Sequence, residues 1–485
     1  MATTTKNALD ALLAIRNGNV TARWNFPAVI GSSPDSGAGI GQGVKLTYSF
    51  LSSQPDYFSG VGLSGFRSMN AVETQAARGV LAQLSSWFNI QFTETAADGQ
   101  LGFAMSSQAP SSSGQAFYPA FGYTLINGKV SSVAASPAAG DVWLNRALSR
   151  PDSDWNPGAS GYATLLHEVS HALGLKHTFE APADGYLLDP SLDNERHTVM
   201  SYNTASNCNL ITVTGTASSY SYTWKAISPS TLMPLDVVAL QSLYGANKRF
   251  HRGDQNYRWA RDAEILETIY DAGGIDTIDA SNQRLSCRLD LRPGAFSSIA
   301  MRRTDFEKRS ALGLPDWFTA PLPDGTYDGR QNLAIAAGVT IENAKGGDAD
   351  DVVIGNRAAN LLCGGAGHDL MSGGFGSDRF LFNERPTAAN RDRITDFQPE
   401  SDRILLDDDI FQRFTGSAAG SPIGPAHLRI GTAPRDADDF LVFNPKNQLL
   451  SYAPNGNLTS QLQPITLMPL PAGESLTAAA FLIVS

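Results

Sequence analysis

The sequence predicts a mixed α/β (α+β) N-terminal domain followed by a C-terminal domain built as a parallel β-roll or β-sandwich. Two observations predict this division. Before about residue 250, apolar residues recur at the spacing of helices and strands, whereas after it glycine and aspartate recur every nine residues. The length of 485 residues fits about three domains, or two large ones. We expect an N-terminal helical segment at 1–20, the α/β domain at 21–248 and the repeat domain at 249–485.

The elements of the N-terminal part are each predicted from a local pattern. Helical spacing marks several helices, one of which begins with a capping residue, Asn70, and another of which is followed by Gly245. The expected helices span Asn7–Ile15, Asn70–Phe88, Ser160–Leu173 and Pro234–Tyr244. Alternating or short apolar runs predict strands at Val44–Phe50, Ile90–Glu94 and Leu101–Met105.

The segment HEVSHALGLKH, residues 167–177, carries the chemistry of this part. His167 and His171 are four residues apart, so a helix places them on one face where both can bind one cation. Gly174 can end that helix by adopting the left-handed conformation, which lets His177 return to the metal as a third ligand. Glu168 lies beside the ligands without being one.

Three neutral imidazoles favour zinc and leave a coordination position for water, whose proton Glu168 can accept. The alternative is a helix with partly buried histidines. The extended pattern argues against it, because three of the seven histidines of the chain fall in this one segment in register with the glycine.

The nine-residue repeats predict a calcium-binding roll. Their glycines permit tight turns, their aspartates supply charge, and the apolar residue at the eighth position packs inside. A flexible glycine-rich linker is the alternative, but aspartate stands at the sixth position in three of the four copies. The second copy has Asn360 there, and the first has Ala349 at a usual glycine position. The copies begin at Gly346, Gly355, Gly364 and Gly373.

Charge and composition argue against several classes of binding partner. The net charge of −11 argues against nucleic acid and anionic membranes, and suits either calcium binding or an acidic soluble surface. No apolar run approaches the roughly 20 residues that span a bilayer. The start, MATTTKNALD, lacks a basic stretch followed by an apolar one, so we expect no cleaved secretory signal peptide.

Three widely spaced cysteines, Cys208, Cys287 and Cys363, form neither a disulfide framework nor a Cys-x-x-Cys metal site. One pair could form a disulfide, but we expect buried free thiols.

Taken together, these motifs resemble the serralysins, metzincin zinc endopeptidases that bacteria release through a type I secretion channel. The segment TVMSY at 198–202 resembles the Met-turn of that family. The resemblance implies that Met200 forms an apolar floor beneath the zinc and that Tyr202 is a switchable ligand that also stabilises the oxyanion. The alternatives are core packing for Met200 and a structural role for Tyr202.

The resemblance also implies one zinc ion and several calcium ions. DAGGIDTID at 271–279 and VTIENAKGG at 339–347 resemble the calcium-binding segments between the two domains, and DRITDFQPESDRILL at 392–406 follows the last repeat. The implied calcium ligands are Asp271, Gly273, Gly274, Asp276, Thr340, Glu342, Gly347, Ala349, Asp351, Gly365, Gly367, Asp369, Gly374, Gly376, Asp378, Asp396 and Asp402.

Several features depart from the family pattern. Thr178 follows the third histidine where serralysins carry proline, the three cysteines are unusual, and the segment KRFHRGDQNY is shifted in register. Only six residues precede the first expected helix. We therefore expect either that the chain begins near the mature start or that it lacks a normal propeptide, in which case 1–20 would be a remnant of one. The C-terminal AAAFLIVS resembles the apolar tail of a type I secretion signal.

The implied function is that of a secreted, extracellular, calcium-stabilised zinc endopeptidase with broad specificity, in which zinc and Glu168 activate water. An extended substrate would pair with a sheet edge around Gln115–Pro119. Protein substrates and the type I secretion machinery are the implied partners, a proteinaceous inhibitor is left open, and a monomer is expected. The rivals are a calcium-dependent adhesive module with an inactive peptidase domain, and an astacin-like or matrixin-like metzincin, which the repeats disfavour.

Overall fold

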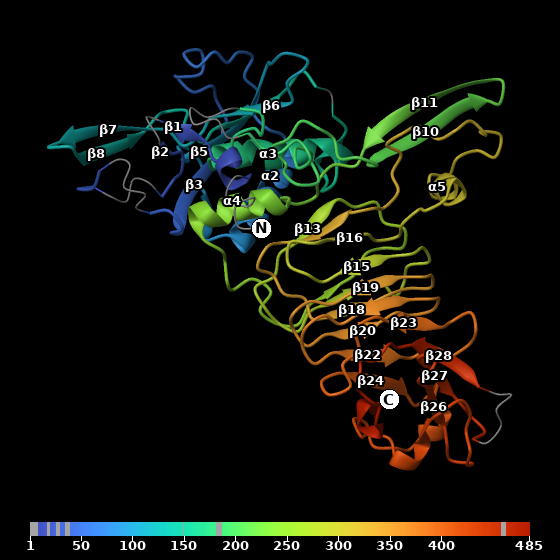
Figure 1. Cartoon of the computed structure of the whole chain (residues 1–485). Coiled ribbons are helices and arrows are strands. Elements are labelled where there is room, and N and C mark those ends of the chain that lie inside the picture. The colour runs from blue at the N-terminus through green and yellow to red at the C-terminus, as the bar shows by residue number, and fades with distance from the viewer. Residues whose placement is uncertain are drawn as a thin grey trace.

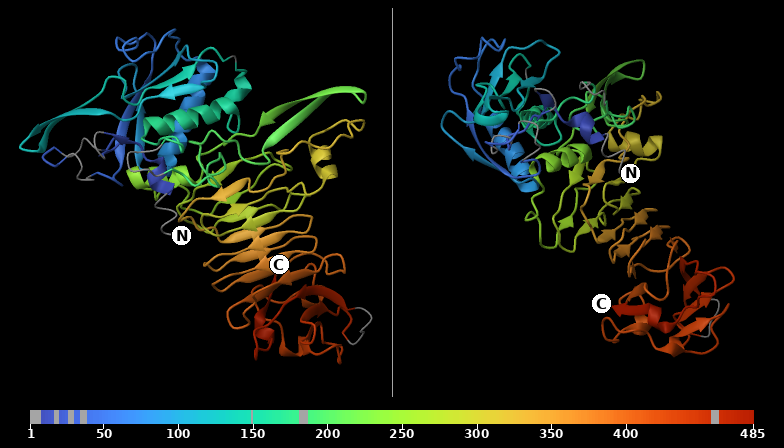
Figure 2. Two further views of the ribbon diagram at one scale, coloured as in Figure 1. Left: turned by 45° about the horizontal axis from the view of Figure 1, so that its top comes forward. Right: turned by 60° about the vertical axis from the view of Figure 1, so that its left-hand side comes forward.

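The computed structural model of the protein describes residues 8–16, 20–25, 30–33, 39–148, 150–180, 187–456 and 462–485. The N-terminal region contains the three longest of the described helices. A stack of short strands follows it (Figures 1 and 2). A mixed α/β region followed by a β-rich region was expected, and this coarse division is confirmed.

The N-terminal region is organised around one five-stranded sheet, in the order β4-β3-β5-β9-β6. All neighbours are parallel except β6, an antiparallel edge strand that pairs with β9. Every residue of β5 and of β9 is buried, as interior strands of a covered sheet require. The strands are β3 (Val44–Phe50), β4 (Ile90–Glu94), β5 (Leu101–Ser106), β6 (Gly114–Ala116) and β9 (Val142–Asn145).

Three long helices pack in this region: α2 (Ala71–Trp87), α3 (Ser160–Ala172) and α4 (Pro234–Tyr244). The expected capping residue Asn70 accepts a hydrogen bond from the Glu73 amide, and Glu73 reciprocates, so α2 begins with a capping box. Helix α3 contacts α2, β9 and the edge strand β6. The face of α3 that bears the histidines therefore lies beside the sheet edge.

The N-terminal helix is shorter than expected. Asn7 lies outside the described residues, the helical residues are 8–12, and Ile15–Arg16 form strand β1, which pairs with β2 (Val20–Thr21). The helix ends because Leu13 pairs with Leu175 in an isolated antiparallel bridge. Long-range pairing with the chain after α3 thus overrides local helical spacing.

Two hairpins project from the N-terminal region in Figure 1. One joins β7 (Phe121–Ile126) to β8 (Lys129–Ala135), and the other joins β10 (Asn209–Thr216) to β11 (Ser219–Ala226). The second hairpin returns the chain to α4.

The C-terminal region consists of two larger sheets between which the chain alternates, and a three-stranded sheet at its start. The first large sheet is parallel throughout and has the order β12-β14-β18-β20-β22-β24-β29. Its strands are β12 (Asn256–Tyr257), β14 (Thr277–Asp279), β18 (Asn343–Lys345), β20 (Leu361–Cys363), β22 (Arg379–Phe382), β24 (Arg403–Asp407) and β29 (Phe481–Val484).

The second large sheet has the order β15-β19-β21-β23-β28-β27-β26-β25, parallel as far as β28. Its strands are β15 (Arg288–Asp290), β19 (Val352–Ile354), β21 (Leu370–Ser372), β23 (Asp392–Ile394), β28 (Gln463–Leu467), β27 (Leu449–Tyr452), β26 (Leu441–Asn444) and β25 (Leu428–Ile430). The three-stranded sheet joins β13 (Glu267–Ile269), β17 (Leu333–Ile335) and β16 (Phe296–Ser297). A short helix, α5 (Asp305–Ala311), falls between β16 and β17 in the sequence.

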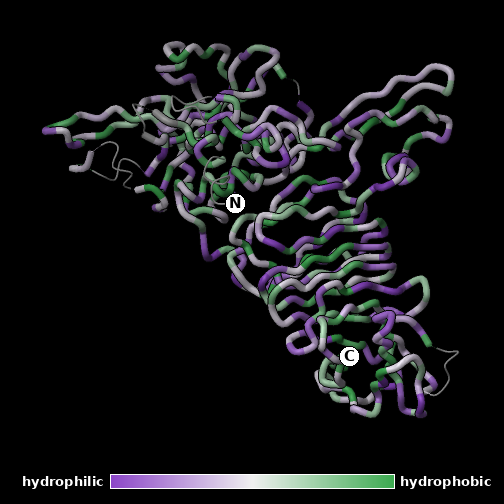
Figure 3. Tube along the Cα trace, viewed as in Figure 1, coloured by the Kyte–Doolittle hydropathy of each residue, from purple (hydrophilic) through white to green (hydrophobic). Residues whose placement is uncertain are grey.

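The eighth residue of each repeat forms the core between the two large sheets. All four of these side chains are fully buried: Val353, Leu362, Met371 and Phe380. Apolar strand residues alternate with polar turns along this region (Figure 3). The alternation explains how nine residues form one strand and one turn, so that two copies complete a full winding.

The cysteines are free and buried, as expected. Among the described helices, none is long and apolar enough to cross a membrane.

Gly174 holds the turn after α3, with φ +110°. A Cβ atom there would lie 2.1 Å from the Ala22 carbonyl oxygen, and the backbone conformation is unfavourable for any other L-residue. We expect Gly174→Ala to lower the free energy of unfolding by about 1–3 kcal/mol, measured as a lower Tm by calorimetry. Gly122→Ala is the matched control, since no atom lies within 4 Å of its Cβ position. Equal Tm values for the two variants would contradict this reading of the turn.

Candidate active site

Three histidine side chains meet at one point. Helix α3 presents His167 and His171 one turn apart, and the chain reverses at Gly174 to bring back His177. The Nε2 atom of His177 lies 3.1 Å from Nε2 of His167 and 3.0 Å from Nε2 of His171. Within the described ranges, no other group of three or more His, Cys, Asp or Glu side chains brings its ligand atoms within 4.8 Å of one another.

The opposite nitrogen of each ring faces an oxygen that can only accept a hydrogen bond. Nδ1 of His167 donates to the Val199 carbonyl at 2.6 Å, and Nδ1 of His171 donates to the Leu175 carbonyl at 2.7 Å. Nδ1 of His177 donates to a Glu180 carboxylate oxygen at 2.5 Å. Each neutral ring therefore carries its proton on Nδ1, and each Nε2 is left with a lone pair.

The Nε2 lone pair of His177 lies about 3 Å from those of His167 and His171, and these lone pairs repel unless a cation lies between them. Burial keeps the rings of His167 and His171 neutral, since it lowers the pKa of His167 to about 4 and that of His171 well below its ordinary value. Three imidazoles, each oriented by an outer hydrogen bond, form the donor set that suits zinc. The residues therefore fit this metal.

Glu168 follows the first histidine on α3 and is only 4% exposed. Its Oε2 atom is buried and has no hydrogen-bond partner, and burial raises the pKa of the carboxyl to about 8. The facing residue is Gly114 of the edge strand β6, where a Cβ atom would lie 2.7 Å from Oε1 of Glu168. A residue without a side chain at position 114 thus leaves room for the carboxylate.

The hydroxyl of Tyr202 lies 2.9 Å from Nε2 of His177, at the point where the three rings converge. Its side chain is 66% exposed, so the ring has space to move away. Met200 is fully buried two residues earlier, in the turn whose Val199 carbonyl orients His167.

Thr178, which departs from the family pattern, connects the third histidine to this turn. Its hydroxyl donates to Oδ1 of Asp193 at 2.6 Å, and the hydroxyl of Ser201 donates to the same oxygen at 2.6 Å. Asp193 therefore ties the residue after His177 to the residue before Tyr202. A proline could make no such hydrogen bond.

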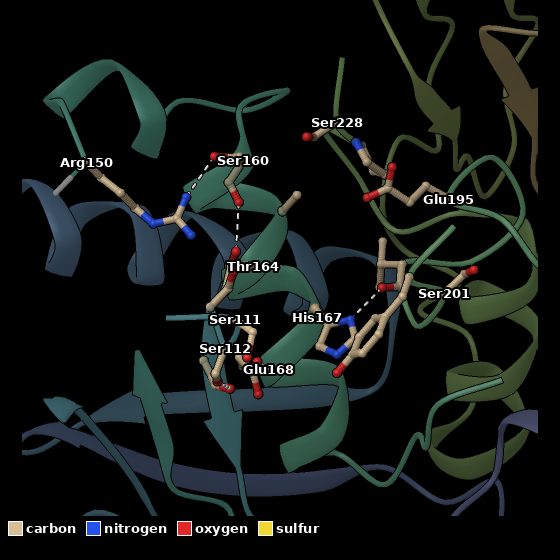
Figure 4. Close-up of a pocket in the computed structure, with 16 residues that line it drawn as sticks. Ser111, Ser112, Arg150, Ser160, Thr164, His167, Glu168, Glu195, Ser201 and Ser228 are labelled. Carbon is tan, nitrogen blue, oxygen red and sulfur yellow. Dashed lines mark hydrogen bonds between the residues drawn. The ribbon is translucent and has the colours of Figure 1, made fainter. Parts of the chain in front are cut away.

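A cavity of about 530 Å³ opens beside the histidines (Figure 4). His167 and Glu168 line one side of it, and Gly114 of β6 borders it. The expected substrate edge at Gln115–Pro119 overlaps β6 only in part, since the strand is Gly114–Ala116. The Phe117 amide donates to the Asp141 carbonyl, so main-chain pairing continues one residue beyond the assigned strand. Within the described chain, β6 pairs with β9 alone, so its outer edge is unpaired.

The first group of expected calcium ligands lies at the start of the strand stack. The Asp276 amide donates to Glu342 at 2.8 Å, and Oδ2 of Asp276 is buried without a partner. Asp271 accepts hydrogen bonds from Tyr257 at 2.5 Å and from the Gly273 amide at 2.7 Å. The neighbouring Gly274 lies in the same turn, and Thr340 is exposed.

The repeat aspartates form two ladders along the turns. In one ladder, Asp369 accepts from the Asp351 amide at 2.8 Å, and Asp392 accepts from the Asp369 amide at 3.1 Å. In the other, Asp378 accepts from the Asn360 amide at 2.9 Å, and Asp402 accepts from the Asp378 amide at 3.1 Å. The remaining expected ligands lie in the same inter-strand turns: Gly347, Ala349, Gly365, Gly367, Gly374 and Gly376.

Asp396 lies outside both ladders. Its carboxylate accepts hydrogen bonds from the Ser372 hydroxyl and from the amides of Gly373 and Gly374. It thus lies at the turn that begins the fourth repeat.

Sequence reasoning missed several residues of these sites. Glu180, Asp193 and Gly114 are close to the histidines only in the folded chain, so no local signal marks them. Asp392 could have been found, because Asp-Arg followed by an apolar residue recurs at Asp378, Asp392 and Asp402.

Comparison with known proteins points to the same family as the geometry. Residues 327–416 match the family model described as Peptidase M10 serralysin C terminal. Metallopeptidase AprA of Pseudomonas marginalis is 30% identical over 339 residues, which are 66% of this chain and 61% of that protein. Serralysin G of Dickeya chrysanthemi is 30% identical over 371 residues, 72% of this chain and 64% of that protein. The chain belongs to the serralysin family.

The match to the serralysin C-terminal model includes both aspartate ladders, which run from Asp351 to Asp402. A serralysin of Photorhabdus laumondii is likewise 30% identical, over 66% of this chain and 60% of its own length. The chain therefore spans about three fifths of the length of these curated relatives.

Glu180 provides a test of the metal centre that does not depend on activity. We expect Glu180→Ala to weaken zinc binding by about tenfold or more, because His177 loses the acceptor that fixes its tautomer. Competition with a chromogenic chelator measures this affinity. Glu474→Ala, which removes an exposed carboxylate at the other end of the chain, is the control. Unchanged zinc affinity in Glu180→Ala would show that the hydrogen bond does not orient the ligand.

Proposed function

We propose that this serralysin is a secreted, calcium-stabilised zinc endopeptidase of broad specificity. The observation that carries the proposal is the convergence of three Nε2 lone pairs, each fixed by a hydrogen bond at Nδ1. A zinc ion bound by His167, His171 and His177 would lower the pKa of a coordinated water toward neutrality.

Side chains of the protein carry out proton transfer and stabilise the oxyanion. Glu168 is the general base that accepts the proton of the attacking water and then passes it to the leaving amine. Its burial excludes bulk water from the carboxylate, and its unpartnered Oε2 is free to hold that proton. Tyr202 donates a hydrogen bond from its hydroxyl to the oxyanion that develops on the substrate carbonyl.

The unpaired edge of β6 supports a binding mode for extended peptides. A substrate segment would add to this edge by main-chain hydrogen bonds, which do not depend on sequence. Gly114, at the start of β6, borders both the edge and Glu168, so a peptide bond on this strand would lie near the base. Backbone pairing of this kind gives broad specificity.

The two aspartate ladders support calcium binding in the C-terminal region. Burial raises the pKa of Asp351 to about 7 and that of Asp378 to about 6, and burial and a neighbouring carboxylate raise that of Asp369. Oδ2 of Asp369 is buried without a partner. A divalent cation held by these carboxylates and by turn carbonyls removes this penalty. Asp276 and Glu342 provide the same arrangement at the start of the stack.

Folding that depends on calcium would be compatible with secretion of the protein. We infer that the region after 249 is a calcium-binding roll that folds outside the cell, where calcium is plentiful, after passage through a type I channel. The zinc protease domain would occupy 21–248, preceded by the segment 1–20. The protein would act extracellularly as a monomer, on protein substrates.

Replacing the general base tests the mechanism. We expect Glu168→Gln to lower kcat for casein hydrolysis by about 10²–10⁴-fold while the zinc content is retained, because the amide cannot accept the proton. Glu474→Gln serves as the matched control at an exposed site. Equal turnover in wild type and Glu168→Gln would exclude this mechanism. No turnover by the zinc-loaded wild type would favour an adhesive module with an inactive peptidase domain.

Calcium removal tests the role of the ladders. We expect a chelator to lower Tm and to reduce the β signal in circular dichroism, because the buried carboxylates lose their counter-charge. Asp392→Asn should raise the calcium concentration that restores half of the signal, since its ladder loses one charge. Asp316→Asn, at an exposed position, should not. A Tm that is the same with and without chelator would contradict the proposal.

A further inference from the structure

The cavity beside the histidines is bordered by two charged side chains outside the catalytic set. Arg150 and Glu195 lie on opposite sides of it in Figure 4. The wall between them is polar and includes Ser160 and Thr164 on the same face of α3 as His167. This face extends about 10 Å from Ser160 to His167. A substrate side chain next to the scissile bond would enter this space.

The charge of Arg150 is compensated within the protein. Its Nη1 donates to the Ser160 hydroxyl at 2.7 Å and lies 3.9 Å from the Asp154 carboxylate. The guanidinium also lies over the ring of Trp155, 5.9 Å from its centroid. These contacts hold Arg150 against the wall and leave little net positive potential toward the cavity.

The charge of Glu195 is not compensated. Among the described residues, no hydrogen-bond donor or cation contacts its carboxylate, and burial raises its pKa to about 7. Its main chain is fixed, since its amide donates to the Asn203 carbonyl at 2.9 Å. The adjacent Arg196 bonds instead to Gln331 and Ser206. Glu195 therefore presents an unsatisfied acceptor to the cavity, on the side of the turn that leads to Tyr202.

We propose that Glu195 makes this cavity select a lysine or arginine side chain at a position directly flanking the scissile bond. The inference rests on the proposed peptidase function and adds a preference to its broad main-chain recognition. A substrate cation would form a charge-assisted hydrogen bond with the carboxylate, and this bond strengthens in a site from which the substrate expels water. Acidic side chains would meet an unscreened like charge, and apolar ones would leave the carboxylate unpaired.

Cleavage of a proteome-derived peptide library by the zinc- and calcium-loaded protein gives the first test. We expect lysine and arginine to be enriched at one of the two positions that flank the cleaved bond, and aspartate and glutamate to be depleted there. A flat profile at both positions, or enrichment of acidic residues as Arg150 would favour, would overturn the inference.

A matched pair of fluorogenic peptides gives the second test. One carries lysine at the enriched position, and the other carries norleucine, which keeps the methylene chain and lacks the ammonium group. We expect wild type to favour the lysine peptide in kcat/KM by about tenfold or more, and E195Q to lose that ratio. Because a ratio is compared, a smaller fraction of folded E195Q does not affect it. E474Q should keep the wild-type ratio.

The outcomes separate the two proposals. An E195Q ratio equal to that of wild type overturns the role of Glu195 while the peptidase stands. Wild type that cleaves neither peptide in a zinc-dependent manner overturns the proposed function itself.

Discussion

The arrangement of the site depends on the three hydrogen bonds that hold the histidine protons on Nδ1. Each acceptor comes from a different part of the chain: the Val199 carbonyl from the turn before Tyr202, the Leu175 carbonyl from the turn after α3, and the Glu180 carboxylate from the loop beyond His177. If any of these segments moves, one ring can rotate or change tautomer, and a lone pair is lost from the centre. A metal centre of this kind therefore forms only when the surrounding fold is complete.

The fold secures these acceptors through two carboxylates, of which Asp236 is buried and Asp193 is half-buried. Asp236, near the start of α4, accepts hydrogen bonds from the Thr198 hydroxyl and from the Val199 amide, so the helix holds the turn that orients His167. Asp193 ties Thr178 to Ser201, which links the loop of the third histidine to the turn that carries Tyr202. Neither carboxylate contacts the site directly. Both act by fixing the backbone on which the ligands and the tyrosine depend.

Much of this could be predicted from the sequence, because the signals were local. The histidine pattern with its glycine, the capping residue Asn70 and the nine-residue repeats each predict structure over a few residues. What could not be predicted depends on pairing between distant segments. The N-terminal helix ends early because Leu13 pairs with Leu175, and Glu180, Asp193 and Gly114 join the site only through the tertiary fold. Thr178 departs from the family pattern in the sequence, yet in the structure its hydroxyl donates a hydrogen bond to Asp193.

The central claim is that His167, His171 and His177 bind one zinc ion through Nε2. X-ray absorption spectroscopy at the zinc edge, on purified protein of known metal content, tests it most directly. The structure predicts one zinc per chain with three imidazole nitrogens, oxygen in the remaining positions and no sulfur. Substoichiometric zinc after reconstitution, fewer than three imidazoles, or coordination by a cysteine thiolate would contradict it.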